Sequence, residues 1–167
     1  MKSLLLLLLS LPILVSCLAS PYSAKVSGEG FSDKKMRDDI YRVTFEANHH
    51  TTQETTQTYW LYRCAQLSSQ KGYQGFKILS DVSLVEKSHE PRLYASVMYP
   101  HMYYYQNPPK KIIHGDIKLL KGNVTSDPEK RVFNAKDLLK KLHKYVRGKK
   151  CESQNVCPHI KDYLGHK

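Results

Sequence analysis

The sequence lacks the short motifs that mark the common enzyme classes. It has no G-x-S-x-G turn around a nucleophilic serine, no glycine-rich phosphate loop and no H-E-x-x-H metal motif. Eight histidines are present, but none stands in an obvious set with a serine or cysteine nucleophile and an acid. We therefore expect a protein that is not an enzyme and that holds no cofactor.

The chain also has no apolar run long enough for a comfortable membrane span. After Lys2, leucine and other apolar residues dominate residues 4–15, whereas a spanning helix needs about 20 apolar residues. A short positive start followed by a run of this length is typical of a secretory signal peptide. We assign residues 1–16 to such a signal.

Cys17 follows this run directly, in the sequence LVSC, which has the pattern of a bacterial lipobox. Cleavage before Cys17 and acylation of its thiol and amine would anchor the mature chain firmly, since each buried CH₂ contributes about 0.8 kcal/mol. Leu18 follows instead of an aspartate, which resembles lipoproteins forwarded to the outer membrane. We expect a periplasm-facing outer-membrane lipoprotein; the alternative is ordinary cleavage near Ala19 or Ser20 and a free periplasmic or secreted protein.

Acidic residues are in the minority. The sequence has 26 Lys and Arg residues against 15 Asp and Glu residues, a formal net charge of +11 at pH 7, and the signal removes only one of these lysines. In a cytosolic protein this charge would suggest nucleic acid, but the bacterial envelope contains little of it. The expected partners, besides the bilayer that holds the acylated cysteine, are an envelope protein, anionic lipids or cell-wall polymers. The alternative is a basic surface that is simply solvated.

Cysteine is scarce as well. If Cys17 carries lipid, three cysteines remain, at positions 64, 151 and 157. Cys151 and Cys157 are close in sequence and would lie in an oxidising compartment, so they could form a disulfide worth about 2 kcal/mol. Cys64 falls in a predicted helix and is expected to be a small buried apolar residue. A metal site formed by Cys151, Cys157 and His159 matches no common zinc spacing, and we predict none.

The length suggests one domain, without internal repeats or low-complexity segments. Residues 17–39 are rich in Ser, Gly and Lys and show no sustained period, so we expect a tether followed by a partly ordered lead-in. A single α+β domain is expected over residues 40–148. A basic, cysteine-containing tail follows over residues 149–167.

Two helices are predicted in this domain. Thr51 can cap the first, with Glu54 as its reciprocal partner, and Gly72 would end it. Asn134 can cap the second, over residues 135–147.

The strand predictions complete the fold. Residues 40–48 alternate between apolar and polar side chains, which is typical of a half-buried strand. Further strands are predicted over residues 76–85, 92–99 and 111–121, with a bulge or bend at Gly115. The order β-α-β-β-β-α predicts a two-layer α+β sandwich, with helices on one face of a mixed sheet.

Four segments in order, GFSD, YRVTFEAN, YWLYRCAQL and GYQGF, resemble a family of small proteobacterial lipoproteins. Those proteins have a GYSD-like lead-in, a Y-R-V-x-F-x-G-N strand, an L-x-R-A-A-E-L helix and a G-Y-x-x-F motif. The resemblance covers residues 28–80 and implies no activity or catalytic residue. The chain departs from it at Ala47, Cys64 and Gln66, where the family has Gly, Ala and Glu. Loss of the acid at Gln66 weakens any role that required a carboxylate there.

Two features are candidate partner contacts. Residues 98–110 concentrate Tyr99, Tyr103, Tyr104 and Tyr105 between prolines, and tyrosine suits wet interfaces because it joins an apolar ring to a polar tip. Alternation would bury about half of these rings, and a loop could expose the others.

The last predicted helix is the second candidate, because Lys136, Lys140, Lys144 and Arg147 recur on one side of it. Such a helix can lie on an anionic membrane. We favour an apolar face docked on the sheet, with lysines that are simply solvated in the usual case. Docking does not prevent Lys140 and Lys144 from contacting an anionic partner.

His49 and His50 support an alternative function as a periplasmic ligand-binding or metal-binding protein, together with the cysteine-containing tail. Adjacent histidines in a strand point to opposite faces and do not readily share a metal, although a loop would relax this constraint. Capping and surface roles are the simpler interpretation.

Overall fold

The described residues form ten helices and strands. In a computed structural model, which describes residues 19–26, 28–87, 92–96, 99–105 and 108–148, they are β1 (Gly30–Lys35), β2 (Ile40–Ala47), α1 (Gln53–Gln70), β3 (Gly75–Ile78), β4 (Ser83–Lys87), β5 (Arg92–Ser96), β6 (Tyr99–Tyr105), β7 (Lys110–Leu120), β8 (Val132–Asn134) and α2 (Ala135–Val146). For β5 and β6 only the backbone is described. The predictions for the signal peptide, for Cys17 and for the tail with Cys151 and Cys157 lie outside the described residues.

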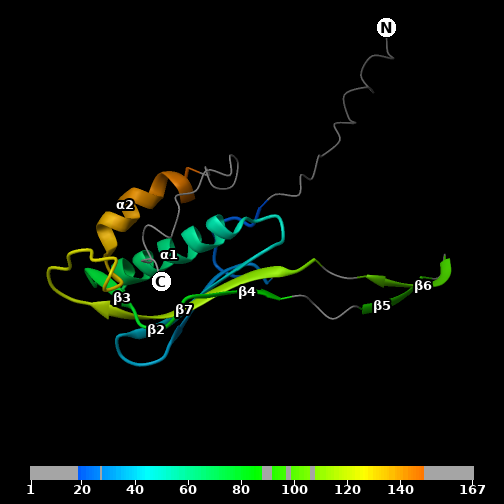
Figure 1. Cartoon of the computed structure of the whole chain (residues 1–167), viewed down its shortest axis with the longest axis horizontal. Coiled ribbons are helices and arrows are strands. Elements are labelled where there is room, and N and C mark those ends of the chain that lie inside the picture. Colours follow the sequence, from blue (N-terminus) through cyan, green and yellow to red (C-terminus); the bar gives the residue numbers. More distant parts are fainter. Residues whose placement is uncertain (1–18, 27, 88–91, 97–98, 106–107, 149–167) are drawn as a thin grey trace, which may run out of the picture.

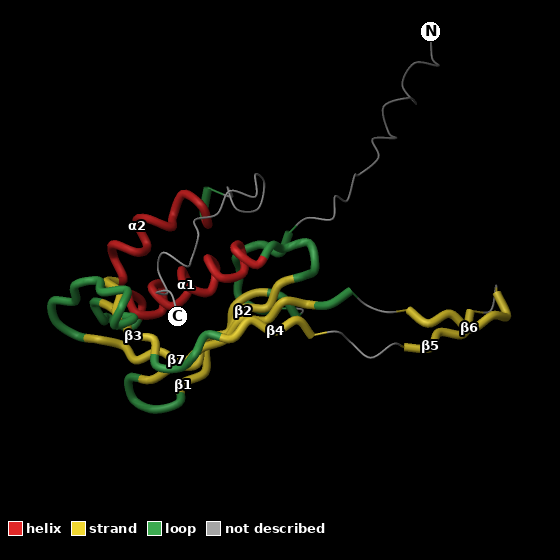
Figure 2. Tube along the Cα trace, viewed as in Figure 1, coloured by secondary structure: helices red, strands yellow, loops and turns green. Residues whose placement is uncertain are grey.

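β7 is the central strand of the sheet. The described strands are ordered β1-β2-β7-β3-β8, β4 also pairs with β7, and all these neighbours are antiparallel. β2 and β3 therefore run in the same direction on either side of β7, and α1 crosses over between them. Both helices lie on one face of the sheet (Figures 1 and 2). The predicted two-layer α+β sandwich is confirmed.

The alternation predicted for β2 is confirmed. Val43, Phe45 and Ala47 are fully buried against the helices, whereas Arg42 on the opposite face is exposed. β7 presents Ile113, Ile117 and Leu119 to the same core. The apolar layer between sheet and helices is therefore made by the period-two pattern of two neighbouring strands.

α1 begins one residue later than predicted. Its N-cap is Thr52, whose side chain accepts a hydrogen bond from the backbone N–H of Thr55. Thr51, the predicted cap, is instead fully buried. The predicted stop at Gly72 is confirmed: Gly72 has a φ of 77°, and Tyr73 N–H closes the helix by donating to the Ser68 carbonyl.

α1 packs very closely on β7, because Gly115 has no side chain. A Cβ at Gly115 would lie 2.8 Å from Cζ2 of Trp60, a distance that real side chains do not tolerate. The fully buried Trp60 indole also donates a 2.9 Å hydrogen bond from Nε1 to the Val43 carbonyl of β2. Gly115 is thus the point at which the helix seats on the sheet.

The single strand predicted over residues 76–85 is divided into β3 and β4. Both pair with the same edge of β7, and residues 79–82 separate them. At the break the Ser80 hydroxyl accepts a 2.8 Å hydrogen bond from Asp116 N–H, and Leu79 N–H donates to the Asp116 carbonyl. The bulge predicted at Gly115 is not found: β7 pairs with β2 without a register shift through Gly115, and the break lies in the facing chain between β3 and β4.

The lead-in is more ordered than predicted. β1 pairs with β2 over its whole length, so that Phe31 faces Phe45 and Asp33 faces Val43. Asp33 thus occupies an inward position, which interrupts the apolar period that would have revealed the strand. Phe31 packs against the core, and Ser20 is fully buried.

Other strands also depart from the predictions. The strand expected over residues 92–99 ends at Ser96, and Tyr99 begins β6, which pairs with β5 as a separate two-stranded sheet. The tyrosine segment expected as a loop is therefore strand in its backbone. β8 was not predicted, because three residues are too few to show a period. None of the described helices is long and apolar enough to cross a bilayer.

Gly115→Ala is expected to destabilise the protein by about 1–3 kcal/mol, because the added methyl group overpacks the contact with Trp60. Urea unfolding at neutral pH measures the change. In a Trp60→Phe background the added cost of Gly115→Ala should shrink, since the ring atoms nearest the new methyl group are gone. An equal cost in both backgrounds would show that Trp60 is not the cause.

Candidate functional site

α2 is held with its apolar side on the core. Its N-cap Asn134 accepts a 3.1 Å hydrogen bond from the backbone N–H of Asp137, as predicted. One side of the helix is buried at Ala135, Leu138, Leu142 and Val146, each no more than 4% exposed. α2 packs against α1, β3 and β8. The predicted docking of α2 on the fold is confirmed.

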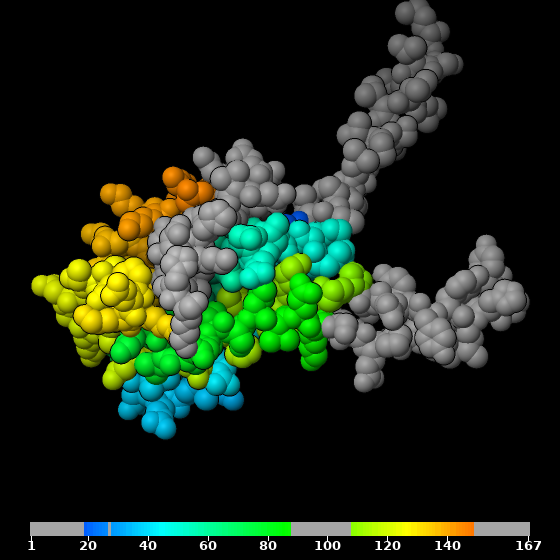
Figure 3. All heavy atoms as spheres, viewed as in Figure 1, coloured from blue at the N-terminus to red at the C-terminus, as the bar shows by residue number. Residues whose placement is uncertain are grey.

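Docking leaves a row of lysines on the outer side of α2. Lys136, Lys140, Lys141 and Lys144 are all exposed. A surface hollow of about 440 Å³ is lined by Asp137, Lys140, Lys141 and Lys144. We call Lys136, Lys140, Lys141 and Lys144 the lysine face; the helix that carries it lies at the surface in Figure 3.

The charge of the lysine face is not neutralised by the described part of the protein. No ion pair between described residues involves any of its four lysines. Lys144 Nζ lies 4.9 Å from the centroid of the Tyr145 ring, a cation–π contact that leaves the charge in place. Within the described part of the chain, an external anion can therefore approach these lysines without breaking an ion pair.

Two basic residues next to the lysine face make contacts within the fold instead. Arg147, grouped with the lysines from the sequence, places its guanidinium carbon 5.3 Å from the centroid of the Tyr22 ring. His143 Nδ1 lies 3.4 Å from the Tyr62 hydroxyl of α1. These contacts link the end of α2 to the lead-in and to α1.

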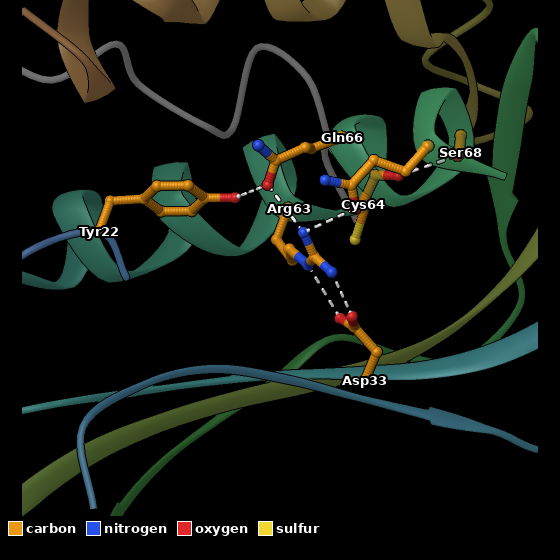
Figure 4. A network of polar contacts seen from close by, with 7 residues as sticks. Tyr22, Asp33, Arg63, Cys64, Gln66 and Ser68 are labelled. Carbon is orange, nitrogen blue, oxygen red and sulfur yellow. Dashed lines mark hydrogen bonds and ion pairs between the residues drawn. The ribbon is translucent and has the colours of Figure 1, made fainter. Parts of the chain in front are cut away.

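A second polar cluster is centred on Arg63 of α1 (Figure 4). Its guanidinium forms a two-pronged ion pair with the Asp33 carboxylate of β1, including a 3.0 Å bond from Nε to Oδ1. Nη1 donates to Oε1 of Gln66 at 2.7 Å and to Oε1 of Gln70 at 3.2 Å. Tyr22 donates its hydroxyl proton to the same Gln66 oxygen at 2.8 Å.

This cluster holds the lead-in on the domain. The Arg63 and Asp33 side chains are only 9% and 17% exposed, and the Arg63 guanidinium carbon lies 4.1 Å from the centroid of the Phe31 ring. Burial lowers the pKa of Arg63, but hydrogen bonds with Asp33 more than compensate, so the group stays charged. Gln66 acts as a hydrogen-bond acceptor, a role that an amide oxygen fills without a carboxylate.

Cys64 and Tyr22 are not reactive groups in this arrangement. Cys64 is free and fully buried, as predicted, and burial raises the pKa of its thiol well above the usual value. Burial likewise raises the pKa of the Tyr22 hydroxyl. Both groups are therefore protonated at neutral pH, and a protonated thiol is a poor nucleophile.

His49 and His50 lie in the turn after β2 rather than in the strand. Both are exposed, and their ring centroids are 3.7 Å apart. Among the described residues, no group of three His, Cys, Asp or Glu side chains lies close enough to hold a metal ion. The structure brings the two imidazoles together but gives them no third ligand from this part of the chain.

The other candidate contacts are placed only by their backbone. Tyr103, Tyr104 and Tyr105 pair with Tyr94, Leu93 and Arg92 of β5, and Tyr99 pairs with Ser96. Their side chains lie outside the described part of the chain. The tyrosine contact therefore stays a prediction.

Comparison of the chain with protein-family models, with curated proteins and with solved structures finds no match.

Arg63→Met is expected to destabilise the protein by about 3 kcal/mol, because it leaves the Asp33 carboxylate largely buried without a partner. Urea unfolding measures this cost, and Asp33→Asn in the same chain should recover part of it.

Arg42 provides the matched control, since it forms a similar two-pronged pair with Asp116 on the open face, where its side chain is 46% exposed. Arg42→Met should cost less than about 1 kcal/mol. If the two arginine variants lose the same free energy of unfolding, burial of the Arg63 pair does not add to its contribution to stability.

Proposed function

We propose that this protein is a non-enzymatic bacterial envelope lipoprotein, anchored in the outer membrane through acylated Cys17, that binds an anionic envelope partner through the lysine face of α2. The observation that carries the partner-binding part is the exposure of Lys140 and Lys144 beside a hollow, without ion-pair partners among the described residues. The lipobox at Cys17 and the resemblance to small lipoproteins support the compartment.

The form of the lysine face indicates the kind of partner. Lys136, Lys140 and Lys144 are four residues apart, so successive side chains rise by about 6 Å along one side of the helix. Lysine is a flexible point charge that does not require the planar geometry of an arginine site. This arrangement suits negative charges repeated along a surface: an acidic protein face, anionic lipids or a cell-wall polymer.

We propose no catalytic role for the lysine face. Among the described residues, the hollow is lined by one aspartate and three lysines of α2, and all four are exposed. Exposed lysines lack the electrostatic advantage of a water-excluded catalytic site. They can bind an anionic partner by charge, and such binding should weaken as salt concentration rises.

Palmitate labelling of the full-length protein in a Gram-negative host tests the anchor. The wild type should incorporate the label, and Cys17→Ala should not, because the acylated thiol is gone. In membrane fractionation, the labelled wild type should be found with the membranes and the unlabelled variant should not. An unlabelled wild type would mean a free secreted or periplasmic protein.

Photo-crosslinking from position 141 tests the lysine face. With p-benzoylphenylalanine in place of Lys141, intact cells should give one or more crosslinked species, which Lys140→Gln with Lys144→Gln should reduce several-fold. Each lysine near an anionic surface contributes about 1 kcal/mol to the binding free energy, so the loss of two should be measurable.

Lys34→Gln with Lys77→Gln is the matched control, because both lysines are exposed on β1 and β3 and have no ion-pair partner among the described residues. It removes the same charge and should leave the crosslinks unchanged. If both double variants lose crosslinks equally, the effect depends on net charge and not on the lysine face. Replacement of Tyr103, Tyr104 and Tyr105 tests the tyrosine contact in the same assay, and unchanged crosslinks would exclude it.

A further inference from the structure

The chain is fixed to the domain only three residues after Cys17. Ser20 has no exposed surface. Its backbone N–H donates a 2.8 Å hydrogen bond to Thr51 Oγ1, and its hydroxyl donates to Glu29 at 2.6 Å. The same hydroxyl accepts a 2.8 Å hydrogen bond from Asn48 N–H. Ser20 is therefore a buried part of the fold, and a flexible tether does not extend to residue 39.

The residues after Ser20 continue this attachment. Phe31 N–H donates to the Ser23 carbonyl and Lys25 N–H donates to the Phe31 carbonyl, both at 2.9 Å. The Tyr22 ring lies between Phe31 at 5.0 Å and Tyr62 at 5.1 Å, measured between ring centroids. The attachment thus combines backbone pairing with aromatic packing, so a pull on the anchor is transmitted to the sheet and to α1.

A short connection limits how far the domain can move from the bilayer. Two residues separate Cys17 from Ser20, so even a fully extended chain spans only about 11 Å between them. The interfacial layer on each side of a bilayer is itself about 5–8 Å thick. A cysteine acylated at this level keeps Ser20 at, or just above, the lipid headgroups.

We infer that the end of the domain around Ser20 rests on the surface of the bilayer in a fixed orientation, an inference that depends on the proposed acylation of Cys17. Ser20 bonds to Asn48 and Thr51, which border the turn that carries the exposed His49 and His50. Lys111 Nζ donates to the His49 carbonyl at 3.2 Å, so the start of β7 lies at the same end. This bilayer-facing end comprises Ser20, residues 48–51 and the start of β7.

Lysines stand at the end of β4 and at the start of β7, near the same end of the domain at which Glu29 is bonded to Ser20. Lys87 and Lys110 stand opposite each other in the pairing of β4 with β7, and like charges so placed repel. Lys111 stands opposite Glu86 in the same pairing. An anionic lipid near Lys87 and Lys110 would relieve the repulsion.

The orientation leaves the beginning of the lysine face, with Lys136 and Lys140, away from the bilayer, whereas α2 ends beside Tyr22 of the lead-in. In Figure 1 the connection between β2 and α1 and the adjoining ends of β4 and β7 lie at one end of the sheet, whereas α2 begins at the other. The connection after β7, which contains the exposed Asn123, also lies at that far end. The two ends can therefore be compared directly.

Photo-crosslinking to lipid tests the orientation in the full-length protein. With p-benzoylphenylalanine at the exposed position 50, cells grown with radiolabelled phosphate should yield protein crosslinked to phospholipid. The same probe at position 123 should yield at least five-fold less, relative to palmitate-labelled protein (about 1 kcal/mol of preference). Equal yields from the two positions would overturn the inference.

Lengthening the connection provides the second arm. Twelve Gly and Ser residues inserted after Leu18 add a flexible chain with a root-mean-square length of about 20 Å. Palmitate labelling should persist, and the lipid crosslinks from position 50 should fall several-fold; the same insertion after Asn123 should leave them unchanged. If the protein with the first insertion is still palmitate-labelled and its lipid crosslinks do not fall, the inferred orientation is wrong but the anchor stands. Absence of palmitate label from the parent protein overturns the anchor and the orientation together.

Discussion

The close approach of α1 to β7 at Gly115 is the contact on which the other parts of the structure depend. With Trp60 seated on Gly115 and bonded to the Val43 carbonyl, the helix lies low enough to bury most of its surface between the sheet and α2. The same placement points Arg63 at Asp33, which attaches β1 and the lead-in. It also gives α2 a surface to pack on, so the exposed side of α2 is a consequence of how α1 is seated.

Residues with regular periodicity could be predicted from the sequence, and residues placed by tertiary contacts could not. β2, the ends of both helices to within one residue, the burial of Cys64 and the outward direction of Lys140 and Lys144 follow from period and capping. β1 was missed because Asp33 points inward, which is tolerable only because Arg63, thirty residues later, neutralises it. The division of β3 from β4 depends on β7, where the bonding partner of Ser80, Asp116, comes 36 residues later in the sequence.

The candidate site likewise has one part that could be predicted from the sequence and one part that could not. The lysine face could be predicted because its spacing matches one side of a helix, although Arg147 belongs to the fold through its contact with Tyr22. The bilayer-facing end could not be found from the sequence, because it is assembled from the lead-in, the turn after β2 and the start of β7. A short segment rich in serine and glycine looks like a linker until its hydrogen-bond partners are known.

The burial of Cys64 has a consequence for the order in which disulfides can form. Disulfide exchange requires an accessible thiolate, and in the folded domain Cys64 is fully buried with a raised thiol pKa. In an oxidising compartment this cysteine can be trapped in a wrong pairing only before α1 packs on the sheet. Seating of Trp60 on Gly115 would therefore protect the chain chemically as well as structurally, because it withdraws the Cys64 thiol from disulfide exchange.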